Sequence, residues 1–178
     1  MTDTSLTDAT GLPHYVYAEA VAHCDGGPGS AYEPDEWYAY RGDTGVLCAM
    51  FYYRRTKPMT VEDYAGIERT LTPVVDGQVW PHGLALSWDE VEGWTYSPLE
   101  DEHSTVGEYW DPLPVPRLAS PAALRALLPR LFSGHEDDLP ASAEEWAEPA
   151  VETLAQRLAA ADADRHGTGP QQTGGDRG

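Results

Sequence analysis

Carboxylates are the side chains of this sequence with the most evident capacity for chemistry. No Lys or Arg lies between Arg69 and Arg117. Paired carboxylates can serve as acid and base, or can hold a divalent cation through their oxygens. The stretch lacks the spacing of a calcium-binding loop, with its obligatory Gly and terminal Glu. It is most simply a solvated acidic surface, and a surface for a protein partner is the functional alternative. Its carboxylates are Asp76, Asp89, Glu90, Glu92, Glu100, Asp101, Glu102, Glu108 and Asp111.

Other residue types that support catalysis or metal binding follow no recognisable pattern. The histidines at positions 14, 23, 82, 103, 135 and 166 include no pair at the i, i+4 spacing of a helical metal site. Cys24 and Cys48 lack zinc-site spacing, and we expect two small buried side chains in a reducing compartment. No Gly-x-Ser-x-Gly segment and no phosphate-binding loop occurs. The sequence predicts no catalytic residue, no metal ligand and no cofactor, and it argues against an enzyme.

One short run predicts where some of the acidic side chains are displayed. Leu84, Leu86 and Trp88 alternate with smaller residues, and the alternation resumes at Trp94 and Tyr96. This period of two indicates a β-hairpin with one buried face, in which the two tryptophans lie opposite each other. The turn between the strands is acidic and ends at a glycine. The candidate partner-binding residues are Trp88, Asp89, Glu90, Glu92 and Trp94.

The hairpin run also carries a resemblance. Leu84-Ala85-Leu86-Ser87-Trp88-Asp89-Glu90 followed by Gly93-Trp94 resembles the core signature of an actinobacterial domain family of unknown function. The resemblance extends over roughly residues 12–134 and implies a fold unit and a bacterial source. It implies no activity, cofactor or partner. The supporting segments are Leu12-Pro13-His14-Tyr15-Val16, Pro112-Leu113-Pro114-Val115-Pro116, Ser120-Pro121-Ala122-Ala123-Leu124 and Leu131-Phe132-Ser133-Gly134.

The elements that must position these side chains follow from periodicity and turn chemistry. Residues 12–24 have helical spacing, and residues 36–40 and 46–54 predict a hairpin whose second strand is covered on both faces. Thr60 with Asp63 predicts the start of a helix that Pro73 ends. Asp76-Gly77 predicts a turn within a short hairpin or bent strand, and residues 106–110 predict an edge strand.

The C-terminal third is predicted to be helical. Ser120 and Pro121 form an N-cap and first helical residue, an apolar stripe runs to Phe132, and Gly134 ends the helix. A weaker helix is predicted from Ser142, with Pro149 splitting or restarting it. We expect disorder over residues 1–11 and 161–178, and a single α+β domain over 12–160. Its core is an antiparallel sheet of about five strands with helices packed on one face.

The charge balance limits the function. The formal net charge is −19, from 30 Asp and Glu against 11 Lys and Arg, which disfavours direct nucleic-acid binding and anionic membrane surfaces. No span is apolar enough to cross a bilayer and no signal peptide is recognisable, so a cytoplasmic location is expected. A basic cluster is expected to offset the acidic surface within the molecule. Its residues are Arg41, Arg54, Arg55 and Lys57.

The leading hypothesis is a non-catalytic, acidic interaction or regulatory protein that binds a basic protein partner. Two alternatives come from other classes of protein. One is a nucleic-acid mimic or toxin-neutralising immunity protein, whose carboxylates would imitate phosphates. The other is a small enzyme with an unrecognised pocket. The sequence does not indicate the oligomeric state.

Overall fold

The computed structural model describes residues 11–24, 32–62, 66 and 68–165. A five-stranded sheet has the order β1-β2-β5-β6-β7, and all of its neighbouring strands are antiparallel. This confirms the predicted α+β fold with a sheet of about five strands. Its strands are β1 (Glu36–Arg41), β2 (Leu47–Tyr53), β5 (Leu84–Asp89), β6 (Gly93–Pro98) and β7 (Asp111–Pro112). The helices are α1 (Tyr15–Ala22), α2 (Pro121–Phe132) and α3 (Glu152–Arg165), and 3-10 helices form at η2 (Glu136–Asp138) and η3 (Pro149–Val151).

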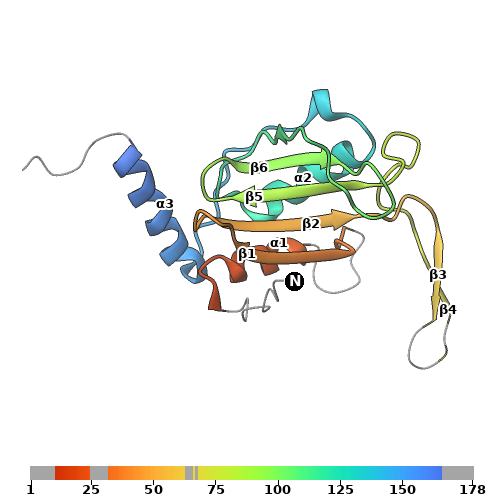
Figure 1. The fold of residues 1–178 in the computed structure, drawn as a ribbon, viewed down its shortest axis with the longest axis horizontal. Coiled ribbons are helices and arrows are strands. Elements are labelled where there is room, and N and C mark those ends of the chain that lie inside the picture. The colour runs from red at the N-terminus through yellow and green to blue at the C-terminus, as the bar shows by residue number, and fades with distance from the viewer. Residues whose placement is uncertain (1–10, 25–31, 63–65, 67, 166–178) are drawn as a thin grey trace, which may run out of the picture.

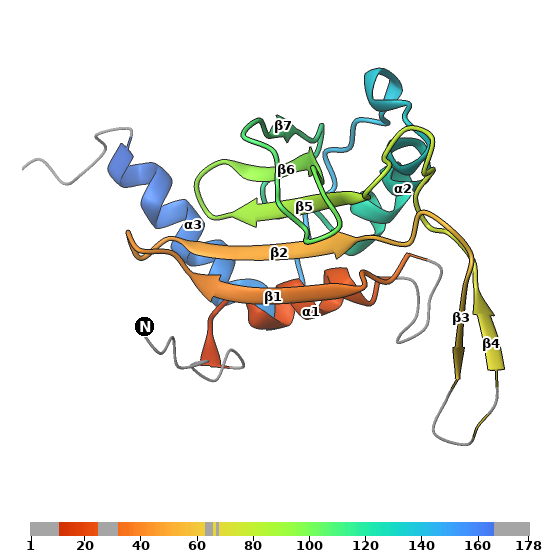
Figure 2. The ribbon, with the colours of Figure 1, turned by 45° about the vertical axis from the view of Figure 1, so that its right-hand side comes forward.

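The two faces of this sheet differ in what covers them. Helices α1 and α2 lie behind the strands in Figure 1, and Figure 2 confirms that both are on the same side. We call this the covered face, and its side chains form the main core: Ala39, Leu47, Ala49, Phe51, Tyr53, Leu84, Leu86, Trp88, Trp94 and Tyr96. We call the opposite side the open face. Strand register places on it Tyr38, Tyr40, Cys48, Met50, Tyr52, Ala85, Ser87, Asp89, Thr95 and Pro112.

Helix α2 forms for the reasons that its sequence indicates. The Ser120 hydroxyl accepts the Ala123 N–H at 3.0 Å and so caps the first turn. Gly134 follows the helix with a φ of 75°, a conformation that glycine adopts without strain. The apolar stripe is buried, which confirms both the helix and its orientation. Its buried residues are Ala123, Leu124, Leu127, Leu128, Leu131 and Phe132.

The predicted helix from Thr60 is wrong. Residues 59–62 and 68–71 form an antiparallel hairpin, β3 (Met59–Glu62) and β4 (Glu68–Leu71), which projects from one end of the sheet in Figure 1. Thr60 with Asp63 imitates a helix cap, but the β-branched residues Thr60 and Thr70 favour strands. Gly66, with a φ of 75°, lies between the two strands. Residues 63–65 and 67 lie outside the described residues.

Two shorter predictions are also corrected. No strand forms around Asp76-Gly77; instead the Asp76 carbonyl accepts the N–H groups of Val79 and Trp80, which makes a tight turn. The expected edge strand at 106–110 is reduced to a single bridge between Val106 and Leu99, and the edge strand β7 follows it.

The C-terminal helix begins later than predicted and continues further. Residues 142–148 are extended, and the Trp146 N–H donates to the Leu118 carbonyl at 2.8 Å. Pairing with the chain before α2 competes with helix formation there, and the helical chain restarts at Pro149. Val151 of η3 and Leu154 and Leu158 of α3 are buried, and α3 extends to Arg165, beyond residue 161. Residues 1–10 and 166–178, most of the two predicted disordered ends, lie outside the described residues.

Candidate functional site

The β5–β6 hairpin forms as predicted, with Trp88 directly opposite Trp94. Both rings lie on the covered face, where Trp88 is 0% and Trp94 2% exposed. The Trp88 indole donates to the Arg117 carbonyl at 2.7 Å, and the Trp94 indole donates to the Tyr17 hydroxyl at 2.9 Å. Burial of the rings and satisfaction of both indole N–H groups explain why the hairpin is held firmly. Both tryptophans are therefore buried inside the fold.

The three carboxylates of the acidic turn, residues 89–92, lie in different environments. Asp89 Oδ1 accepts the N–H groups of Val91 and Glu92 at 2.7 and 2.6 Å, which fixes the turn, and the Asp89 side chain is on the open face. Glu92 is exposed. Glu90, by contrast, is only 7% exposed. The turn therefore presents two carboxylates outward and directs one inward.

The inward carboxylate is fully engaged by groups of the same chain. Glu90 Oε1 accepts the Leu47 N–H at 3.0 Å, and Arg157 of α3 donates to both Glu90 oxygens at 2.6 and 2.8 Å. The hydrogen bonds from Arg157 are the main cause that holds the pKa of Glu90 below its usual value. Glu90 therefore stabilises the molecule internally, and the structure does not place it beside Asp89 and Glu92 as a third outward charge.

A cavity of about 430 Å³ lies on the open face beside the acidic turn. Ser87 and Thr95 are opposite each other across β5 and β6, and Pro112 of β7 continues the same row. The chain after β6 returns across this face, where Trp110 packs against the small cluster formed around Met50 and Leu99. The cavity thus combines carboxylates, hydroxyls and an indole from three strands, the acidic turn and one loop. Its lining residues are Ser87, Asp89, Glu92, Thr95, Trp110 and Pro112.

Tyrosines continue the open face beyond the cavity. Tyr38 and Tyr40 of β1 are 39% and 38% exposed, with ring centroids 5.5 Å apart. Burial raises the pKa of Tyr40 to about 12, so its hydroxyl is neutral at physiological pH. Tyr40, Cys48 and Asp89 are cross-strand neighbours, so these rings lie in register with the acidic turn. The face offers aromatic surface and neutral hydroxyls next to the carboxylates.

Two arginines of the basic cluster form ion pairs with nearby carboxylates of the chain, and the offset of the acidic surface by the whole cluster stays a prediction. Arg54 forms an ion pair with Glu36 at 2.7 Å and stacks over the Tyr52 ring at 4.9 Å. Arg55 forms an ion pair with Asp35, also at 2.7 Å. In the described parts of the chain, neither Asp89 nor Glu92 is in an ion pair. The carboxylates at the cavity therefore keep their charge available.

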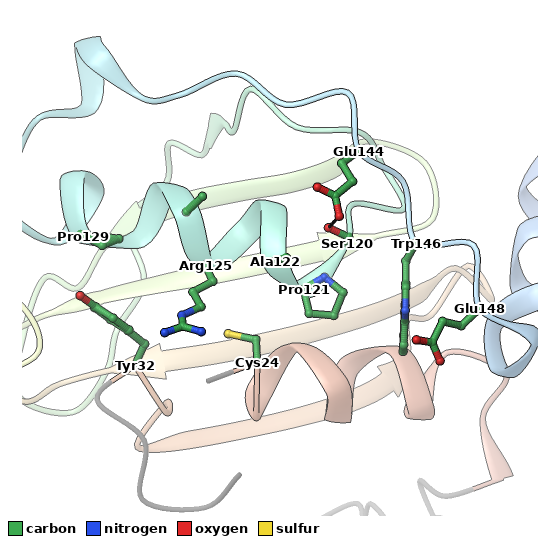
Figure 3. A pocket seen from close by; sticks show the side chains of 11 residues that line it. Cys24, Tyr32, Ser120, Pro121, Ala122, Arg125, Pro129, Glu144, Trp146 and Glu148 are labelled. Atoms are coloured by element: carbon green, nitrogen blue, oxygen red, sulfur yellow. Dashed lines mark hydrogen bonds between the residues drawn. The ribbon is translucent and has the colours of Figure 1, made fainter. Parts of the chain in front are cut away.

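A second cavity, of about 840 Å³, lies on the helical side of the molecule. It is bounded by the end of α1, by α2 and by the extended chain at 142–148, and Figure 3 shows Arg125 reaching from α2 toward Cys24. Glu144 accepts a hydrogen bond from the Ser120 hydroxyl at 2.7 Å, which joins the extended chain to the start of α2. The described residues that line it include no histidine, so no Cys–His pair is assembled there. Residues 25–31, which follow the lining residue Cys24 in the sequence, lie outside the described residues.

The described residues provide neither a cluster suited to a metal ion nor a helix suited to a membrane span. No group of three or more His, Cys, Asp and Glu side chains among them is arranged to hold a metal ion. No helix in the same ranges has both the length and the apolar character required to cross a membrane.

Comparisons with known proteins add no identification. No protein-family model matches the chain, and neither a curated protein nor a solved structure is significantly similar to it. The site must therefore be interpreted from its own geometry.

The sequence identified part of this site. Asp89 and Glu92 meet at the cavity, whereas Trp88, Glu90 and Trp94 are inside the fold; whether any of the five contacts a partner stays a prediction. Ser87 and Thr95 were missed, although the alternation that buries Trp88 and Trp94 also places their neighbours on the opposite face. Trp110 and Arg157 had no local signal, because each reaches its position through long-range packing.

Proposed function

We propose that this protein binds a basic protein partner, and that a Lys or Arg side chain of that partner enters the cavity at the acidic turn. One observation supports the proposal above the others. Asp89 and Glu92, without ion-pair partners in the described chain, lie beside the Trp110 indole at a recessed site on the open face, which none of the described helices covers. The proposed role is non-catalytic, and the proposed compartment is the cytoplasm.

A cation fits this site for two physical reasons. Carboxylates attract an ammonium or guanidinium group, and an aromatic ring face attracts the same group through its quadrupole. The methylene stem of Lys or Arg can pack against Trp110 and Pro112 while its charge approaches Asp89 and Glu92. The net charge of −19 adds long-range attraction for a basic partner. A phosphate or carboxylate ligand would be repelled by the same charges.

The experiment is a calorimetric titration with a hexalysine peptide, using variants matched in charge. Asp89→Asn combined with Glu92→Gln removes two charges from the cavity, and Glu136→Gln with Asp137→Asn removes two from η2, where both residues are exposed. Exposed ion pairs contribute roughly 0.2–1 kcal/mol each, so the cavity variant should lose roughly two- to thirtyfold in affinity. The η2 variant should lose less. Association should also weaken with salt, since the Debye length falls from ~10 Å at 0.1 M to ~3 Å at 1 M.

The other outcomes have defined meanings. Equal losses in the two variants would indicate distributed attraction by the whole acidic surface, as expected of a nucleic-acid mimic, and would reject the cavity as the site. Unchanged affinity in both variants, together with insensitivity to salt, would reject a basic partner altogether.

A further inference from the structure

Helix α3 reaches the acidic turn from the side opposite the cavity. The turn lies at the end of the β5–β6 hairpin nearest α3 in Figure 1. Glu90 has the same strand parity as Trp88, so it points toward the covered face, while Asp89 points toward the open face. A single turn is therefore contacted by α3 on its inner side and lines the cavity on its outer side.

The first attachment of α3 is the ion pair of Arg157 with Glu90. Two hydrogen bonds, from Arg157 Nε to Glu90 Oε2 at 2.6 Å and from Nη2 to Oε1 at 2.8 Å, give it the bidentate geometry that fixes orientation as well as distance. The Glu90 side chain is 9% exposed and that of Arg157 41%, so the carboxylate depends on this arginine for its counter-charge. The same carboxylate receives the Leu47 N–H, which ties α3 through Glu90 to β2.

A second attachment lies one helical turn further along α3. Arg117 donates to both carboxylate oxygens of Asp162, and its Nη1 also donates to the Glu90 backbone carbonyl at 3.2 Å. Gly93, which ends the turn, has a φ of 87°, and a Cβ there would lie 3.3 Å from the Arg117 Cα. Arg117 therefore packs against the end of the turn while Asp162 holds its guanidinium.

The backbone of the turn is also held by hydrogen bonds. The Glu90 N–H donates to the Leu47 carbonyl, and the N–H groups of Val91 and Glu92 donate to Asp89 Oδ1. With the Glu90 side chain and carbonyl also bound, the positions of Asp89 and Glu92 relative to the sheet are fixed before any partner arrives. A surface that is already ordered loses less entropy on binding.

We propose that α3 is the positioning element of the basic-partner site, holding the acidic turn in its binding conformation through the Arg157–Glu90 and Asp162–Arg117 pairs. This inference rests on the proposed function, because it concerns the regulation of the same cavity. It also implies that any event that detaches α3 from the turn weakens binding at a site that α3 itself does not line.

The test uses a variant for which simple electrostatic attraction and positioning by α3 predict opposite changes in hexalysine affinity. Arg157→Gln removes one positive charge, so general electrostatics predicts tighter binding of hexalysine. Positioning predicts weaker binding, by roughly two- to tenfold, the equivalent of having to order about one side chain on association. The control is Arg130→Gln, which has the same charge change at the exposed Arg130–Asp138 pair, neither residue of which lines the cavity. If Arg157→Gln binds hexalysine as tightly as Arg130→Gln or more tightly, the inference is overturned.

A second measurement needs no ligand and separates the two proposals. Amide hydrogen exchange at Leu47, Glu90, Val91 and Glu92 should accelerate in Arg157→Gln but not in Arg130→Gln. Asp162→Asn changes a partly exposed side chain, so it should accelerate exchange at these amides less. This variant provides the test if Arg157→Gln does not fold. Accelerated exchange with no effect of the cavity variant on hexalysine affinity would retain the role of α3 and reject the proposed function. Unchanged exchange in both α3 variants would overturn the role of α3 alone.

Discussion

The two faces of the sheet are built from alternate residues of the same strands, yet they differ in almost every physical respect. On the covered face Trp88 and Trp94 are buried under helices, and their indole N–H groups are bonded inside the chain. On the open face Ser87 and Thr95, one residue away, border a cavity. The comparison teaches that alternate residues of one strand differ in role: those on the covered face stabilise the fold, and those on the open face are available for the proposed binding. A shift of one position along the chain should therefore change the kind of effect that a mutation has.

The acidic turn repeats this division on a smaller scale. Glu90 is directed inward and is neutralised by Arg157, whereas Asp89 and Glu92 are directed outward beside Trp110. A carboxylate with low exposure needs a counter-charge, and an exposed one does not. Three acidic residues of similar appearance in sequence thus have two separate roles.

The largest expected effect compares two neighbours in β6. Trp94→Ala removes a buried ring and leaves the Tyr17 hydroxyl without its indole donor, so it should cost roughly 3–5 kcal/mol of unfolding free energy. Thr95→Ala, on the open face, should cost less than about 1 kcal/mol. Denaturant unfolding of both variants checks the comparison. Equal costs would mean that the two faces are not energetically distinct.

Helix α2 offers a second comparison, between its buried and exposed sides. Leu131→Ala should cost roughly 2–5 kcal/mol, because Leu131 is fully buried against the core. Arg130→Ala, one residue earlier, removes an exposed ion pair with Asp138 and a hydrogen bond to its carbonyl, and should cost roughly 0–1 kcal/mol. Thermal or denaturant unfolding measures both. A stable Leu131→Ala protein would show that α2 does not seal the covered face.

Acid should lower the free energy of unfolding in two separate pH ranges, through two groups on the covered side of the turn. His14 is buried against Trp88, its Nε2 lies 2.8 Å from the Cys48 carbonyl, and Arg41, Glu90 and Arg157 are the charges around it. Burial lowers the pKa of His14, so the unfolded chain takes up a proton first and stability falls as pH drops below 6.5. The pKa of Glu90 is also lowered, so its contribution is lost as pH drops below 4.5.

Unfolding free energies measured between pH 7 and 3 test these assignments. His14→Gln should flatten the upper part of the pH dependence and Glu90→Gln the lower part. Asp89→Asn should leave both parts in place. If neither inward variant changes the profile, the buried groups are not the source of acid sensitivity.

The smallest expected change in stability belongs to the outward carboxylates. Asp89→Asn retains Oδ1 as the acceptor for Val91 and Glu92, and Glu92 is exposed, so the double variant with Glu92→Gln should remain within about 0.5 kcal/mol of wild type. Denaturant unfolding provides the measurement. A larger loss would mean that the outward carboxylates support the fold, and the division within the turn would fail.

Whether a feature could be predicted from the sequence depends on how far apart along the chain the residues that form it lie. The β5–β6 hairpin and α2 follow from alternation, a cap and a glycine, all of them local. The error at Thr60 arose because Thr and Asp at cap spacing occur in strands as well as helices, and nothing local decided between them. The convergence of Trp110 and Arg157 on opposite sides of the turn could not be predicted, because residues 20 or 67 positions apart carry no mutual signal in one sequence.

Binding at the open face is tested most directly by nuclear magnetic resonance mapping of the isotope-labelled protein during titration with hexalysine. We expect the shift changes to concentrate on the backbone signals of Ser87, Asp89, Glu92 and Thr95 and on the indole N–H of Trp110. The indole signals of Trp88 and Trp94, on the covered face, should move least. Changes centred on η2, or spread evenly over the acidic residues of the chain, would contradict binding at this cavity.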